Sequence, residues 1–92
     1  MDTIAVNSKY NQAMSEQNNT IKAIIVDDEQ EGIHALEFML KQNCPQVEVL
    51  KTFQASVDAL KGIRALEPDL LFLDIKMPNI NGLELLLSLI HI

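Results

Sequence analysis

The stretch that most constrains the fold is the apolar run Leu70–Leu73, which stops abruptly at Asp74. Four bulky apolar residues without alternation predict a short strand buried on both faces, as in a parallel sheet. Pro78 and Gly82 then predict a loop. Open α/β sheets bind their ligands at the carboxyl ends of the strands, so Asp74 is a candidate site residue. Considered alone, this stretch is equally consistent with Asp74 being a turn residue that ends the strand.

Upstream of this run, predicted strands alternate with predicted helices. We expect an apolar, β-branched strand at 21–26 and a strand with interleaved charges at 47–53. Helical periodicity predicts helices at about 31–42 and 56–66, and a third helix after Gly82. This alternation is typical of right-handed crossover units, so we predict an α/β fold with a parallel sheet. Glu48 and Lys51 favour an edge position for the strand at 47–53.

The apolar spacing predicts which face of each helix is buried. In the first helix the core face is expected to comprise Ile33, Leu36 and Leu40, widened by Phe38 and Met39. In the second helix Ser56 is the expected N-cap. The core stripe of that helix is expected to comprise Val57, Leu60, Ile63 and Leu66.

The two ends of the chain differ from its middle. Residues 1–20 are rich in Asn, Gln and Ser, with apolar residues scattered without period. This pattern predicts a flexible amino-terminal tail ahead of a domain at 21–92. A short frayed helix at 10–16 is the alternative, and Met14 is a second candidate start. Residues 87–92 resemble a translated transposon-end sequencing adapter, so we expect the native sequence to diverge after about Leu86.

Composition narrows the function classes. The 92 residues are 48% hydrophobic, which suits one small domain. The net charge of −6 argues against a basic nucleic-acid-binding surface in this piece. The single cysteine, Cys44, excludes an internal disulfide and favours a reducing compartment. Because neither a signal peptide nor a membrane-spanning apolar run is evident, we expect a cytoplasmic protein that does not bind a membrane.

Acidic residues follow two of the predicted strands. Asp27 and Asp28 end the strand at 21–26, and Asp74 ends the strand at 70–73. Since neighbouring parallel strands end at the same edge of a sheet, the three carboxylates should converge. A cation relieves their mutual repulsion, and hard oxygen ligands with room for water favour Mg²⁺. A helix amino terminus, which attracts negative charge, explains the acidic pair by itself, but Asp74 at the matching strand end favours a site.

The segments Ile24–Glu29 and Leu71–Gly82 together carry a family resemblance. Their order and separation resemble the receiver domain of two-component response regulators. The resemblance covers residues 21 to about 86. It implies a flavodoxin-like, doubly wound parallel sheet, truncated here after about three of its five strand–helix units.

The resemblance also implies a role for each acidic residue. Asp74 would be the phosphoacceptor, taking a phosphoryl group from the phosphohistidine of a sensor histidine kinase. Asp28 would bind Mg²⁺ directly and Asp27 largely through water. Asp74 and the backbone carbonyl of Lys76 would complete the metal ligands. The chain would then be a phosphorelay signalling module rather than an enzyme. The local sequence resembles that of regulators of the LytTR type. Their DNA-binding output domain would be missing here.

Two further expectations follow from the family's architecture. Its strand order places the strand at 70–73 beside a strand that this chain lacks, so we expect an exposed apolar edge. The family's Ser/Thr at the end of its fourth strand and its Lys at the end of its fifth strand, which contact the phosphoryl group, have no counterpart either, because those strands are absent. We therefore expect the chain to be inactive as a fragment.

Three alternatives stay open. An aspartate-nucleophile phosphatase or phosphotransferase would typically show Asp-Xaa-Asp at one strand end, and the adjacent pair at Asp27 lacks that spacing. A nucleotide-binding half-domain would need a glycine-rich turn, and residues 27–31 contain no glycine. The third alternative is a non-functional, truncated reading frame.

Overall fold

The computed structural model of the chain describes residues 3–7 and 20–74. In chain order the described elements are β1 (Thr3–Asn7), β2 (Ile21–Val26), α2 (Gln30–Asn43), β3 (Val47–Phe53), α3 (Ser56–Leu66) and β4 (Leu70–Asp74). The predicted strands at 21–26, 47–53 and 70–73 and the two predicted helices are confirmed. The predicted third helix and the loop at Pro78 lie outside the described residues.

The strands form one sheet in the order β1-β4-β2-β3. β2 pairs in parallel with both β3 and β4, whereas β1 runs antiparallel to β4. The parallel α/β architecture predicted from the alternation of strands and helices is therefore confirmed. β3 lies at the edge of the sheet, as its interleaved charges predicted.

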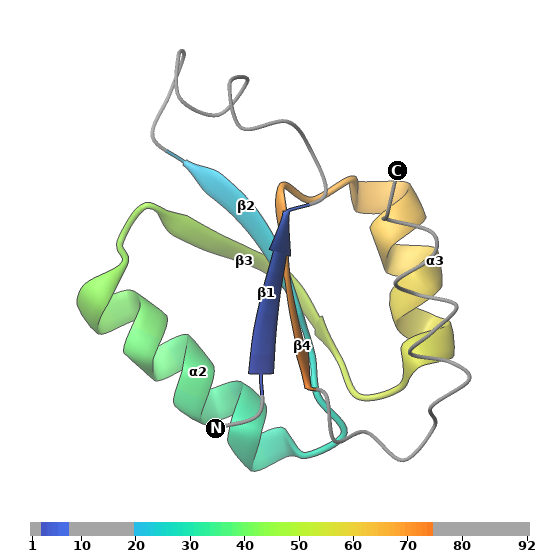
Figure 1. The fold of residues 1–92 in the computed structure, drawn as a ribbon, viewed down its shortest axis with the longest axis horizontal. Coiled ribbons are helices and arrows are strands. Elements are labelled where there is room, and N and C mark those ends of the chain that lie inside the picture. Colours follow the sequence, from blue (N-terminus) through green and yellow to red (C-terminus); the bar gives the residue numbers. More distant parts are fainter. Residues whose placement is uncertain (1–2, 8–19, 75–92) are drawn as a thin grey trace.

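The two helices cover opposite faces of the sheet (Figure 1). On the α3 face the core consists of Ile24, Val26, Ala59, Ile63, Leu71 and Leu73. On the α2 face it consists of Ile25, Ile33, Leu36 and Leu40, with Phe72 packed against them. Because successive residues of a strand point to opposite faces, the uninterrupted apolar runs of β2 and β4 supply both cores.

The buried helix faces differ in part from the periodicity prediction. Ile33, Leu36 and Leu40 of α2 are buried as predicted, but Phe38 and Met39 are 67% and 41% exposed. In α3 the buried residues are Ser56, Ala59 and Ile63. Val57 and Leu66 are 56% and 41% exposed, so their placement on the core stripe was wrong. The smaller side chains let α3 approach the sheet closely, and Gly62 packs directly against the ring of Phe53.

The predicted N-cap at Ser56 is also wrong. Ala55 is the N-cap of α3, and Ser56 is the first helical residue. The Ser56 side chain is 2% exposed, and its Oγ has no hydrogen-bond partner in the described part of the chain. Serine suits this buried position between α3 and the sheet because its side chain is small, and not because its oxygen caps the helix.

The largest difference from the prediction is at the amino terminus. Thr3–Asn7, expected to belong to a flexible tail, forms β1 and pairs with the whole length of β4, from Thr3 opposite Asp74 to Asn7 opposite Leu70. β4 is therefore not the exposed apolar edge that we expected. The backbone N–H and C=O groups along an unpaired strand edge can form hydrogen bonds with any extended segment within reach. In this chain β1 is that segment.

Candidate functional site

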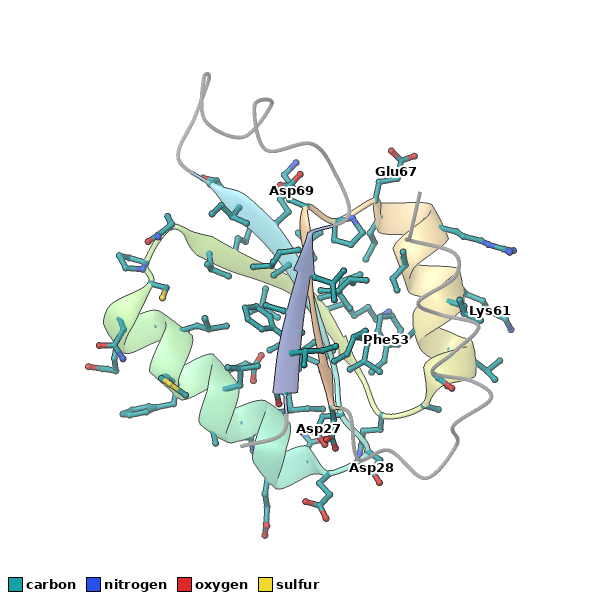
Figure 2. The ribbon with its side chains drawn as sticks, in the orientation of Figure 1. Asp27, Asp28, Phe53, Lys61, Glu67 and Asp69 are labelled. Atoms are coloured by element: carbon teal, nitrogen blue, oxygen red, sulfur yellow. The ribbon has the colours of Figure 1, made fainter. Side chains whose placement is uncertain are left out.

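Three carboxylates meet at one end of the sheet, where β2 and β4 both end. One ligand oxygen of each of Asp27, Asp28 and Asp74 lies within 4.8 Å of the others. Asp27 and Asp28 directly follow β2, and Asp74 is the last residue of β4. Figure 2 shows Asp27 and Asp28 side by side at this end of the molecule. The convergence predicted from the strand ends is confirmed.

Asp27 is the buried member of the cluster, with 8% of its surface exposed. Its backbone N–H donates to the carbonyl of Phe53 at 3.0 Å, which extends the β2–β3 pairing by one residue. Its Oδ1 accepts a hydrogen bond from the backbone N–H of Glu29 at 2.9 Å. Glu29 is the N-cap of α2 and makes no side-chain capping bond of its own. Asp27 therefore also accepts a hydrogen bond from a backbone N–H at the start of α2. This agrees with the alternative that the acidic pair serves the helix amino terminus.

Gly32 is a site residue that the sequence analysis missed. A Cβ atom added at this position in α2 would collide with Oδ2 of Asp27 and lie 3.1 Å from its Cγ. The first turn of α2 thus closes over the carboxylate and holds it on the sheet. The signal available in the sequence was a glycine in a helical first turn, where glycine lowers helix stability and needs a packing reason.

The environment raises the pKa of Asp27. Burial is the largest cause, and it outweighs the hydrogen bond from Glu29, which lowers the pKa. A side-chain hydrogen bond with Asp74 and the negative charges of Asp74 and Asp28 raise it further. Ionisation of Asp27 beside Asp28 and Asp74 is therefore unfavourable unless a cation offsets the charge.

These residues fit a small divalent cation. The donor set is entirely carboxylate oxygen, which hard cations such as Mg²⁺ prefer. A cation placed among the three groups would offset the repulsion that contributes to the raised pKa of Asp27. Asp28 is exposed, which leaves room for the water molecules that Mg²⁺ retains. Lys76, whose backbone carbonyl was expected to be a ligand, lies outside the described residues.

The backbone around Asp28 is held from the neighbouring strand. Gln54, the residue after β3, donates from Nε2 to the carbonyl oxygen of Asp28 at 3.3 Å. The contact orients the Asp28 peptide at the mouth of the cluster. No pattern in the sequence pointed to Gln54, because the contact depends on the β2–β3 register.

Comparison with known proteins identifies the family. The sequence model of the response regulator receiver domain family matches residues 23–91 of this chain. The chain belongs to the response regulator receiver domain family. The match includes five of the six residues, 87–92, that resemble adapter sequence, and it excludes β1.

Curated relatives are similar along the receiver segment. An uncharacterized response regulatory protein of Vibrio cholerae is 39% identical over 66 residues. The transcriptional regulatory protein BtsR of Salmonella typhi is 42% identical over 65 residues. These segments are 72% and 71% of this chain but only 27% of each relative, so the receiver chain spans about a quarter of their length.

A third relative is named as an enzyme. The protein-glutamate methylesterase/protein-glutamine glutaminase of Hydrogenovibrio crunogenus is 38% identical over 72 residues, which is 78% of this chain and 19% of that protein. No solved structure matches the chain significantly. None of the helices described in the receiver is long and apolar enough to cross a membrane.

Replacement of Gly32 by alanine is expected to weaken divalent-cation binding about tenfold or more, the usual loss when the residues that orient a ligand are disturbed. The added methyl group displaces the Asp27 carboxylate, although alanine favours the helix. Titration with Mg²⁺ by calorimetry or NMR measures the effect.

Gly62→Ala is the matched control for Gly32→Ala. It is the same change in α3, where the new methyl group meets Phe53 instead of the cluster. Equal Mg²⁺ affinities in the two variants would contradict the role of Gly32.

Proposed function

We propose that the chain is a phosphoacceptor receiver module in which Asp74 takes a phosphoryl group in the presence of Mg²⁺. The observation that carries the proposal is the position of Asp74 at the end of β4, with Asp27 and Asp28 within 4.8 Å, in a chain of the receiver family. The phosphodonor is the phosphohistidine of a sensor histidine kinase. The setting is cytoplasmic.

The chemistry needs little from the protein beyond positioning and charge. An oxygen of the Asp74 carboxylate attacks phosphorus, and the phosphorus–nitrogen bond to the histidine breaks. The electron pair of that bond stays on the imidazole, and Asp74 becomes an acyl phosphate. Mg²⁺ bound by Asp27 and Asp28 would offset the charge on the phosphoryl oxygens. The attacking group in this step is the carboxylate form of Asp74.

Incubation of the full-length parent protein with acetyl phosphate and Mg²⁺ tests the proposal. Acetyl phosphate replaces the kinase as donor, and borohydride reduction followed by mass spectrometry maps the modified residue. We expect modification at Asp74 in the wild type and none in Asp74→Asn. Asp58→Asn, which removes an exposed carboxylate of α3, should be modified like the wild type.

A modified residue other than Asp74, or an unmodified wild type, would contradict the proposal. The earlier expectation that the chain is inactive as a fragment stays a prediction. It covers the phosphoryl transfer as well as the relay of the signal, because the residues with which the family contacts the phosphoryl group are expected to be missing.

The output of the whole protein is proposed from its relatives. BtsR is named a transcriptional regulatory protein, which supports a DNA-binding output domain outside this chain. The methylesterase/glutaminase relative supports the alternative of an enzymatic output domain. The LytTR type stays a prediction. The family match favours the receiver over an aspartate-nucleophile phosphatase, while the truncated reading frame stays an open alternative.

A further inference from the structure

An open groove lies between α3 and the outer edge of the sheet, away from the acidic cluster. Its volume is about 500 Å³, and its lining comes from β3 on one side and from α3 on the other. β3 is the last strand of the sheet, with β2 as its one strand neighbour in the described part of the chain. Among the described residues nothing closes the groove beyond β3. This shape suits a segment of another chain better than an enclosed small molecule.

An irregularity in β3 turns two side chains toward α3. The pairing with β2 skips Leu50, so that Val49 and Lys51 lie opposite consecutive residues of β2. Val49 consequently packs on the α2 face, whereas Lys51 and Phe53 lie on the α3 face and line the groove. Lys51 holds its Nζ 5.7 Å from the centre of the Phe53 ring, within the range of a cation–π contact. Figure 2 shows the Phe53 ring between the sheet and α3.

α3 lines the groove with one side of its surface. The lining residues recur at intervals of three and four, which places them on one side of a helix: Asp58, Lys61, Gly62, Ala65 and Leu66. Gly62 lacks a side chain, so the Phe53 ring packs directly against α3. Leu66 is 41% exposed and borders the groove instead of joining the core. Phe53 and Leu66 therefore give the groove an apolar floor.

The two lysines give this apolar groove a positive charge. Lys51 and Lys61 are exposed, and neither forms a salt bridge within residues 3–7 and 20–74. Two lysines against the single carboxylate of Asp58 leave the lining with a net positive charge. The whole chain carries a net charge of −6, so most of it repels an acidic partner. Charge complementarity at the groove therefore favours a partner that is acidic.

We propose that this groove docks a short acidic segment of a partner protein. An aliphatic or aromatic side chain of that segment packs on Phe53 and Leu66, and its carboxylates lie beside Lys51 and Lys61. The apolar anchor supplies most of the affinity, and the flanking charges set specificity and association rate. A lysine and an irregular register are features that protect an edge strand from further pairing. The segment therefore lies in the groove and does not extend the sheet.

Variants of the lining separate charge from packing. The double variant Lys51→Glu, Lys61→Glu reverses the charge of the groove. Lys41→Glu is its control, because it makes the same change at an exposed position on α2, which covers the opposite face of the sheet. Leu66→Ala shortens the apolar floor. Val57→Ala is the matched control, because Val57 is an exposed apolar residue of α3 outside the groove lining.

The test uses the full-length parent protein, labelled with ¹⁵N, and three acetylated octapeptides followed by NMR titration. The first peptide has a central Leu-Phe pair flanked by Asp and Glu, the second replaces the pair by Ser, and the third replaces the acidic residues by Lys. We expect the first peptide to bind at least fivefold more tightly than the others, the contribution of about one buried apolar side chain or of the flanking charges. The amide signals of residues 51–53 and 61–66 should shift.

The variants should change the affinity for the first peptide in a graded way. The double charge reversal should weaken binding about tenfold or more, because two attractions become repulsions. Leu66→Ala should weaken it about fivefold, and Lys41→Glu and Val57→Ala should bind like the wild type. Asp58→Asn should bind about twofold more tightly, since it removes a like charge from the lining. Circular dichroism spectra and unfolding midpoints should match those of the wild type in the charge-reversed variant.

A wild type that binds none of the peptides, or that prefers the basic one, would overturn the inference. Equal weakening by Lys41→Glu and by the double charge reversal would also overturn it, because the effect would then come from overall charge. Binding of phosphatidylserine vesicles or single-stranded DNA at the groove, in place of the acidic peptide, would contradict a protein partner. The proposed function at Asp74 is independent of each of these outcomes.

Discussion

Removal of residues 1–7 is expected to increase the self-association of the chain. Without β1, the backbone N–H and C=O groups along the outer edge of β4 lose their partners. Leu71 and Leu73, which are fully buried, become exposed on one side of that edge. Strand edges of this kind pair with other chains. The free energy of unfolding should fall by about 2–4 kcal/mol, judged from the burial of one or two apolar side chains.

Light scattering and urea unfolding of the shortened chain measure both effects. The control is a peptide of residues 1–7 added in trans, which should reverse the increase in self-association by pairing with β4. A peptide of the same composition in scrambled order should not. A monomeric shortened chain with unchanged stability would show that β1 does not protect β4.

Asp27→Asn is expected to abolish Mg²⁺ binding and to stabilise the chain at neutral pH in the absence of Mg²⁺. The pKa of Asp27 is raised in the folded chain, chiefly by burial. The stability that Asp27 contributes is therefore fully present below its ordinary value of 3.8 and is lost as the pH rises through the raised value. Asparagine keeps the shape and a hydrogen bond to Asp74 without the charge. The advantage of the variant should thus grow with pH.

Urea unfolding across the acidic to neutral range, with and without Mg²⁺, measures this linkage. At ten times its dissociation constant, Mg²⁺ should stabilise the wild type by about 1.4 kcal/mol and the variant not at all. Asp58→Asn removes an exposed acidic residue of α3 and should respond to Mg²⁺ like the wild type. A wild type indifferent to Mg²⁺ would contradict the assignment of the metal ligands.

The elements of the parallel sheet were predictable because each is encoded locally. An unbroken apolar run such as Leu70–Leu73 can only be buried on both faces, whatever its neighbours. Helical spacing located α2 and its core residues Ile33, Leu36 and Leu40. The acidic cluster followed from the same reasoning, because parallel strands that end together bring Asp27 and Asp74 together.

The failures share a cause, since each depends on contacts between segments far apart in the chain. Ser56 became a buried helical residue because α3 packs closely on the sheet, which the helix's own sequence does not reveal. Phe38 and Val57 were misplaced because apolar spacing shows a helix face but not how far the neighbouring sheet extends over it.

The sequence by itself determined the order of β2, α2, β3, α3 and β4 and the carboxylates at the strand ends. Only the tertiary structure decided that Thr3–Asn7 closes the edge of β4, because five residues of unremarkable composition become a strand only when an unpaired edge lies within reach. Tertiary structure also decided the partners of Asp27. The contact of Asp27 with Gly32 depends on how α2 packs on the sheet. The hydrogen bond from Gln54 to Asp28 depends on the register of β2 and β3, and a one-residue shift of register would turn each side chain to the other face.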